Sequence, residues 1–157
     1  MIALAEFEEY GETYARDIVR NAQALGQCLA AEGFDVLAEG RNYTASHQVL
    51  TRHGEIDSGA GARAAQLLED AGIVTNMNML PGDTKAMTPS GLRLGVQELT
   101  RVGMGVTEME EVAKLYGRVL IRGEDPDSVK KSVSALKGEF QAIRYCFNED
   151  EVSGYPL

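Results

Sequence analysis

The sequence predicts an α+β domain, in which helices cover a small and mainly antiparallel sheet. Three observations support this fold class: a long helical pattern comes first, short alternating segments bounded by glycine and proline follow, and two helical segments come last. The chain has 157 residues, of which 44% are hydrophobic, which suits one globular core. We therefore expect a long helix over residues 1–32, a small domain over residues 33–147 and a loose polar tail over residues 148–157.

The first 32 residues are predicted to form one unusually long helix. Apolar side chains recur along it at steps of three and four residues and form a single stripe, which consists of Tyr14, Ile18, Ala22, Leu25 and Leu29. Gly33 is suited to end the helix, because glycine readily adopts the left-handed conformation of a C-terminal cap. Such length is unusual in a small domain, so we expect this helix to run along a larger body and connect to it.

Two short strands and a helix are predicted next. The segment "FDVLAEG" has strand character and ends in glycine, and "ASHQVLTRH" alternates so that His47, Val49 and Thr51 share one face. Ser58 and the small residues after it open a helix through "GARAAQLLEDAG", which Gly72 closes. Strands and helices therefore intermingle along this part of the chain.

The second half contains one more strand and two helices. "IVTNMNML" is a brief extended piece, "PGDTKAMTP" is a loop bounded by prolines, and "GLRLGV" is a strand. Thr107 is expected to cap a helix over residues 108–121, with Glu110 completing a capping box. Pro126, which suits a first helical position, begins a last helix that is expected to reach about Phe147.

The composition limits the partners and the location that we expect. Lysine and arginine number 15 against 24 aspartates and glutamates, and the net charge of −9 argues against binding to nucleic acid or to an anionic membrane. Cys28 and Cys146 form no metal-binding motif, so we expect free thiols in a reducing compartment. No membrane-spanning segment or signal peptide is visible, so we expect a soluble cytoplasmic protein.

Arg93 is the most unusual residue of the predicted strand "GLRLGV". A permanent cation lies there between apolar neighbours and two glycines, in a segment that otherwise has the pattern of a half-buried strand. One explanation is a structural ion pair, because a buried arginine is costly unless a carboxylate neutralises it. The other is a clamp for a carboxylate or phosphate of a ligand, because the planar guanidinium offers two parallel donors. The residues alone leave both explanations open.

Other polar residues give weaker indications. No third metal ligand accompanies His47 and His53, so a hydrogen-bonded structural histidine is a simpler interpretation than a zinc site, and we predict no metal. Asn76 and Asn78 lie two positions apart on an extended piece, so their amides point to the same side. These amides either form turns or recognise a polar ligand.

Several segments, taken in order, resemble the C-terminal small domain of serine hydroxymethyltransferase. "YARDIVRNAQALGQCLAAEGFDVLAEG" resembles the family's interdomain helix and first small-domain strand, and "SHQVLT" and "LLEDAGIVTNMNMLPGD" resemble the segments that follow. "SGLRLGVQELTRVGM" is similar to the family's "SGIRIGTPALTTRGF" and is the most specific of these matches. The resemblance covers about residues 3–122 and implies the small domain of a fold-type I pyridoxal-phosphate enzyme.

This resemblance implies roles for two residues. The arginine of the family's "SGIRIG" segment binds the α-carboxylate of the amino-acid substrate, and Arg93 occupies that place. The asparagine of the family's "NKN" segment helps to bind the folate cosubstrate, and Asn78 occupies the matching place, next to Met77 where lysine is common. His47 matches a strand histidine of the family, to which we assign no catalytic role.

The resemblance also implies what this chain lacks. The family's cofactor, pyridoxal 5′-phosphate, is held as a Schiff base by a lysine of a "THK"-like motif in a large domain. None of the lysines here lies in such a motif, so we expect no catalytic or cofactor-binding residue in this chain and no activity from it alone. The start at a methionine, close to where the large domain would end, favours one subunit of a split enzyme with a large-domain partner. A fragment or a diverged remnant, and association of the chain with itself, remain open.

Departures from the family pattern leave the reaction open. Pro89 replaces a threonine, Thr51 stands where the family has an aspartate, and "PGDTKAMT" replaces a segment usually rich in serine, proline and phenylalanine. Glycine–serine one-carbon transfer with tetrahydrofolate and the carbon–carbon bond formation of a threonine aldolase or transaldolase are therefore both compatible with the sequence. A non-catalytic binding or regulatory domain that keeps the fold is the alternative from a different class.

Overall fold

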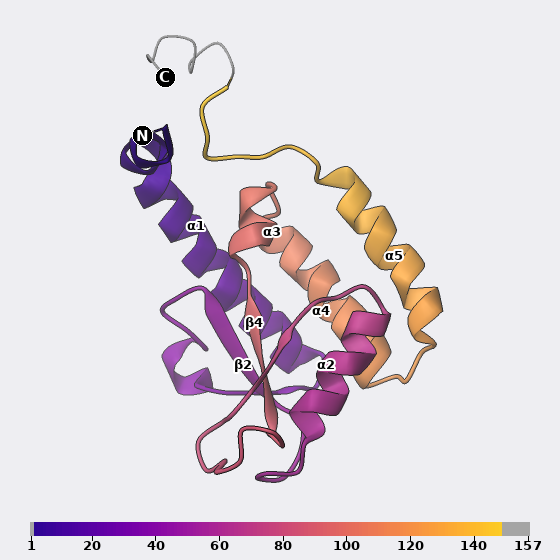
Figure 1. Ribbon diagram of the computed structural model, residues 1–157. Coiled ribbons are helices and arrows are strands. Elements are labelled where there is room, and N and C mark those ends of the chain that lie inside the picture. The colour runs from indigo at the N-terminus through magenta and orange to yellow at the C-terminus, as the bar shows by residue number, and fades with distance from the viewer. Residues whose placement is uncertain (1, 149–157) are drawn as a thin grey trace.

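The computed structural model describes residues 2–148 and confirms the predicted α+β class (Figure 1). Helices cover a four-stranded antiparallel sheet. The long helix α1, Ile2–Ala31, passes behind the sheet with its C-terminal half, whereas its first turns project beyond the sheet (Figure 1). Gly33 follows the helix with a φ of 100°, as its role in ending the helix requires. The predicted long N-terminal helix is therefore confirmed.

The sheet has the strand order β1-β2-β4-β3, and each neighbouring pair is antiparallel. The strands are short: β1 is Asp35–Val36, β2 is Gln48–Arg52, β3 is Asn76–Asn78 and β4 is Gly91–Gly95. The edge strand β3 pairs with β4 only from Asn78 opposite Gly91 to Asn76 opposite Arg93. The last two residues of β4 therefore have a strand neighbour only on the β2 side.

Alternation along the strands gives the sheet one buried face and one open face. Residues directly opposite each other on antiparallel strands point to the same side. Val49 opposite Leu94 and Thr51 opposite Leu92 form the buried face, on which all four residues are at most 3% exposed. Arg93 lies between two of these residues in sequence and is exposed on the other face. The period of two along β4 thus separates the core from the candidate site.

The helices are layered against the buried face. After α1 come α2 (Ala60–Asp70), α3 (Gln97–Arg101), α4 (Val106–Leu120) and α5 (Pro126–Glu139). Helices α1 and α2 contact the strands, α4 packs against both of them, and α5 packs against α2 and α4. Helix α2 approaches the sheet closely at Gly61, where an added Cβ would collide with the carbonyl oxygen of Gly91. A side chain at Gly61 would therefore push α2 away from β4.

One buried asparagine joins α1 to the region after the sheet. Asn21 is 3% exposed, and its Nδ2 donates to Thr100 Oγ1 and to the carbonyl oxygen of Met104, each at 2.9 Å. Thr100 Oγ1 in turn donates to the carbonyl oxygen of Val96 at 2.8 Å. The polar atoms that face this part of the core therefore find partners within the chain.

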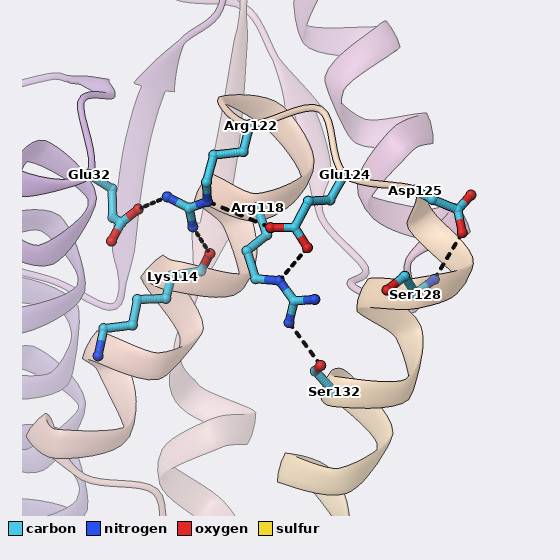
Figure 2. A network of polar contacts seen from close by, with 8 residues as sticks. All are labelled: Glu32, Lys114, Arg118, Arg122, Glu124, Asp125, Ser128 and Ser132. Carbon is cyan, nitrogen blue, oxygen red and sulfur yellow. Dashed lines mark hydrogen bonds and ion pairs between the residues drawn. The ribbon is translucent and has the colours of Figure 1, made fainter.

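A polar network ties the end of α1 to α4 and α5 (Figure 2). Arg122 donates to Glu32 Oε2 at 2.8 Å. Arg118 donates to Glu124 Oε2 and to Ser132 Oγ, each at 2.8 Å. Because these side chains are partly exposed, the network orients the helices more than it stabilises them.

The last helix begins as predicted and ends earlier than predicted. Asp125 Oδ2 accepts a hydrogen bond from the backbone N–H of Ser128 at 3.1 Å, and Pro126 occupies the first helical position. The helix ends at Glu139, so the prediction that it reaches Phe147 is wrong.

Tertiary contacts explain this early end. Residues 140–147 leave the helix and run towards α3 and α1 (Figure 1). The backbone N–H of Arg144 donates to the carbonyl oxygen of Arg101 at 2.7 Å, and the Tyr145 hydroxyl donates to Asp17 Oδ2 at 2.8 Å. These contacts with distant parts of the chain replace the continued helix.

The start of α4 also differs from the prediction. The helix begins at Val106 and not after Thr107, and Gly105 occupies the N-cap position. Glu108 Oε2 accepts from the backbone N–H of Gly105 at 2.6 Å, so Glu108 and not Glu110 makes the reciprocal capping bond. Glu110 instead forms an ion pair within the helix.

Three further expectations concern thiols, membranes and the tail. Cys28 and Cys146 are both free thiols, as predicted. None of the helices within residues 2–148 has the length and apolarity that a bilayer crossing demands. The loose tail predicted over residues 148–157 lies, apart from Asn148, outside the described residues.

Candidate functional site

Arg93 lies at the centre of the open face of the sheet. Its register partners are Leu50 on β2 and Asn76 on β3, which point to the same side as its guanidinium. Within the described part of the chain, its side chain forms no ion pair and no hydrogen bond. The structural ion pair that the sequence left open is therefore not formed with residues 2–148. The guanidinium is available to an incoming anion.

A cavity of about 590 Å³ opens beside Arg93. It lies where β3 begins, between the segment 72–76, the helix α3 and side chains of α4 and α5. Apolar side chains make up most of its lining, and Arg93, Asn76 and Glu98 contribute polar groups. The concavity that a ligand-binding arginine requires is thus present next to Arg93.

The two asparagines of β3 lie on the same face as Arg93. Asn76 is directly opposite Arg93 and is exposed, and Asn78 is opposite Gly91, two positions along the strand. The side-chain amide of Asn78 donates to the carbonyl oxygen of Met79 at 2.6 Å, which leaves its Oδ1 available. The expectation that both amides point to one side agrees with this register.

Two aspartates hold the loops next to these residues, a role that the sequence analysis missed. Asp83 accepts hydrogen bonds from the backbone N–H groups of Asp57 and Leu80 at 2.8 and 2.9 Å, and from both N–H and Oγ of Ser90 at 2.9 and 2.8 Å. These bonds favour the carboxylate and hold the pKa of Asp83 well below its usual range. Asp83 therefore fixes the end of the segment that carries Asn78 and the start of β4.

Asp57 completes this arrangement from the other loop. Its carboxylate accepts from Thr84 Oγ1 at 2.6 Å and from the backbone N–H groups of Thr84 and Lys85 at 2.8 and 2.9 Å, which lower its pKa. The sequence signal for this pair was a turn-forming aspartate in "GEIDSG" and another in "PGDT". Such aspartates are common in loops, so the signal did not single them out.

The two histidines stay apart from this site. His53 Nε2 lies 2.8 Å from Thr51 Oγ1, its ring contacts Phe34 edge-on, and burial lowers its pKa. His53 thus has the contacts of a structural residue, whereas His47 is exposed before β2 begins. No cluster of three or more histidine, cysteine, aspartate or glutamate side chains within residues 2–148 could hold a metal ion.

Comparison with known proteins identifies the family. The family model for serine hydroxymethyltransferase matches residues 2–116, which is more than half of the chain. The chain belongs to the serine hydroxymethyltransferase family. The serine hydroxymethyltransferase of Thermococcus kodakarensis is 49% identical over 159 residues, which cover 100% of this chain and 36% of the relative. That of Methanopyrus kandleri is 51% identical over 148 residues, which cover 93% of this chain and 34% of the relative.

A solved structure supports the same relationship. The L-threonine transaldolase from Pseudomonas fluorescens superposes on this chain with a TM-score of 0.84 and 27% sequence identity, over 98% of this chain and 35% of the transaldolase. The chain therefore spans about a third of the length of the relatives that it matches. Enzymes of this fold type use pyridoxal 5′-phosphate.

The lysines of this member of the family do not fit the Schiff-base position of that cofactor. Such a lysine must be desolvated and easily deprotonated. Lys114 instead forms ion pairs with Glu110 and Glu111 at 2.9 and 2.8 Å, which raise its pKa. The remaining lysines are exposed: Lys85, Lys130, Lys131 and Lys137. Within residues 2–148, none of the five lysines therefore has the buried, unpaired amine that a Schiff base requires.

Proposed function

We propose that this chain is the small-domain component of a serine hydroxymethyltransferase-like enzyme, which acts on amino acids together with a large domain that carries pyridoxal phosphate. The observation that carries the proposal is Arg93 on an open sheet face, without an ion pair or hydrogen bond of its side chain to residues 2–148, in a chain of this family. The absence of a suitable lysine agrees with a cofactor that is held mainly by the large domain. The chain alone is inactive in this proposal.

Arg93 would bind the α-carboxylate of the amino-acid substrate. A guanidinium can donate two parallel hydrogen bonds to a carboxylate, and charge-assisted bonds of this kind are roughly twice as strong as neutral ones. The interaction gains strength where a second domain covers the face and excludes water. The rigid backbone of β4, paired on both sides at Arg93, supplies the fixed position that orientation of a substrate demands.

Asn78 would contact the second substrate. It lies on the same face as Arg93, and its free Oδ1 can accept a hydrogen bond from a polar ring. Glycine–serine one-carbon transfer with tetrahydrofolate is the first candidate reaction. Aldol-type carbon–carbon bond formation, as in threonine aldolases and transaldolases, is the second candidate reaction. The close superposition on an L-threonine transaldolase supports this second candidate.

The domain boundaries predicted from the sequence form part of this proposal. Residues 1–32 would connect the small domain, residues 33–147, to the large domain. Leu4 and Phe7 on the projecting part of α1 are 75% and 70% exposed, and apolar surface of this kind is typical of an interface. We expect the chain to associate through this surface with a large domain, or with itself where the large domain is missing.

Reconstitution tests the proposal. The chain would be combined with the part of the Thermococcus kodakarensis relative that lies outside the matched third, either as a mixture or as a fusion. We expect absorbance of bound pyridoxal phosphate and activity on serine or threonine that neither part shows alone. A complex that forms and binds the cofactor but lacks both activities would support the non-catalytic alternative instead.

A further inference from the structure

The cavity beside Arg93 has the dimensions of a small-molecule site. Its volume of about 590 Å³ falls within the range of about 300–1,000 Å³ that is typical of ligand pockets. It opens along the edge of β4 beyond Arg93, where β3 no longer covers that strand. The cavity extends from there into the space between α4 and α5, away from Asn78.

The part of the cavity between α4 and α5 is lined mainly by apolar side chains. Val112 and Leu115 from α4 face it together with Val133 and Leu136 from α5 and with Phe140, which follows α5. An apolar or aromatic group placed here would contact side chains from both helices and would be removed from water.

Three polar side chains of the cavity lack hydrogen-bond partners. Thr75 Oγ1 and Gln97 Oε1 are buried and have no partner within the described residues. Tyr116 is only 6% exposed, and its hydroxyl forms no hydrogen bond with those residues either. Gln97 Oε1 lies over Gly95, at 2.6 Å from the position of an added Cβ, so the glycine makes room for this acceptor. The unpaired oxygen atoms of Thr75 and Gln97 are closed off from water and therefore also from a ligand in the cavity. The Tyr116 hydroxyl is not among these closed-off atoms, so it is left to pair with a polar group of a ligand.

The charged side chains of the cavity lining favour an anion. Arg93 and Lys137 both line the cavity, and neither side chain forms an ion pair within residues 2–148. Glu98 is the acidic side chain of the lining. A ligand with a negatively charged group would therefore meet more positive than negative side chains in the lining.

We propose that this cavity binds a small amphipathic acid, whose aromatic or apolar body fills the space between α4 and α5 and whose anionic group lies at Lys137 and Arg93. The Tyr116 hydroxyl, which has no hydrogen-bond partner within residues 2–148, pairs with a polar group of the ligand. The site goes beyond the proposed enzymatic function, because it needs neither the large domain nor pyridoxal phosphate. A ligand at this place would share Arg93 with an amino-acid substrate and would compete with it.

Methionine methyl groups offer a direct test on the whole chain. The probe is 8-anilinonaphthalene-1-sulfonate, which combines an aromatic body with an anionic group, and the protein carries ¹³C at its methionine methyl groups. Met104 lines the cavity and is 4% exposed, whereas Met87 lies outside its lining and is 82% exposed. We expect a saturable shift of the Met104 resonance, assigned with Met104→Leu, and no shift of Met87. A shift of Met87 without one of Met104 would overturn the proposal.

Two variants and an uncharged probe separate the cavity from general hydrophobic binding. Leu136→Trp fills the cavity and is expected to weaken binding at least tenfold, whereas Leu67→Trp, on an exposed part of α2 outside the lining, leaves it unchanged. Lys137→Gln is expected to weaken binding of the sulfonate by about threefold to fivefold. The Lys137→Gln variant should bind the uncharged probe, N-phenyl-1-naphthylamine, as tightly as the wild type does, because this probe has no anionic group. Equal effects on both compounds, or full binding by a folded Leu136→Trp variant, would contradict the proposal.

These outcomes are independent of the enzymatic proposal. If the cavity binds no amphipathic acid, Arg93 can still hold a substrate carboxylate in the combined enzyme. If the combined enzyme is inactive, the response of Met104 to the sulfonate is unaffected.

Discussion

The two faces of the sheet differ in how completely this chain satisfies them. In the core behind the buried face, Asn21 Nδ2 donates two hydrogen bonds to atoms of the same chain, and the neighbouring side chains are closely packed. On the open face and along its edge, Arg93 has no counterion within residues 2–148, and Gln97 Oε1 has no partner. Within residues 2–148, the polar groups of the core are thus paired with one another, whereas the open face keeps groups without a partner.

The largest expected effect separates two adjacent residues of β4. Leu92 is 0% exposed, so Leu92→Ala should lower the free energy of unfolding by about 3 kcal/mol through lost burial and a cavity. Arg93→Ala, on the open face, should change it by less than about 0.5 kcal/mol. Urea denaturation followed by circular dichroism measures both. Similar costs for the two variants would mean that Arg93 supports the fold after all.

The next largest loss of stability is expected for the buried residue Asn21. Asn21→Ala should cost about 2 kcal/mol, because Thr100 and the carbonyl of Met104 lose a buried donor. Gln27→Ala on the same helix removes an exposed hydrogen bond to Asn42 and should cost less than about 0.5 kcal/mol. Thermal unfolding of the two variants would show the contrast, and equal melting temperatures would refute it.

Asp83, which holds the loops next to β3 and β4, makes the stability depend on pH. Its pKa is lower in the folded state than in the unfolded chain, so its contribution to stability is complete above about pH 4 and is lost as the pH falls through the folded pKa. Asp83→Asn should therefore be less stable than the wild type at pH 7, and the difference should shrink below about pH 4. Chemical denaturation across this range measures the difference. Asp70→Asn, which affects one exposed hydrogen bond from Gln66, serves as the control and should show no such trend.

The smallest change in the free energy of unfolding is expected for Tyr116, which lines the cavity. Tyr116→Phe should change the free energy of unfolding by less than about 0.5 kcal/mol, because the hydroxyl has no hydrogen bond to lose within the described residues. Tyr145→Phe should cost about 1 kcal/mol, because its hydroxyl donates to Asp17. Parallel urea titrations would compare them. A larger loss for Tyr116→Phe would mean that the hydroxyl is satisfied by the fold.

The regular elements were predictable because their patterns are local. The apolar stripe of α1, the alternation of β4 and the proline at the start of α5 each lie within one segment. The end of α5 and the short helix Gln97–Arg101 were missed, since contacts with distant segments decide them. The position of Arg93 on an open face follows from alternation, but its lack of a counterion became visible only in three dimensions.

The parts of the site that the sequence analysis missed also depend on contacts between distant segments of the chain. Asp57 and Asp83 are 26 positions apart. No regular spacing in the sequence indicates that their loops are joined by hydrogen bonds. Thr75, Gln97 and Tyr116 come from three distant segments of the chain, so the cavity that they line could not be inferred from a motif.

The binding of glycine to the reconstituted enzyme tests the central claim most directly. Titration calorimetry would compare the wild type with Arg93→Ala and with Arg63→Ala, which removes an exposed cation from α2. We predict that Arg93→Ala weakens glycine binding by about 100-fold, because a bidentate charge-assisted contact is lost, and that Arg63→Ala leaves it unchanged. Equal affinity of the wild type and Arg93→Ala for glycine would contradict the claim that Arg93 holds the substrate carboxylate.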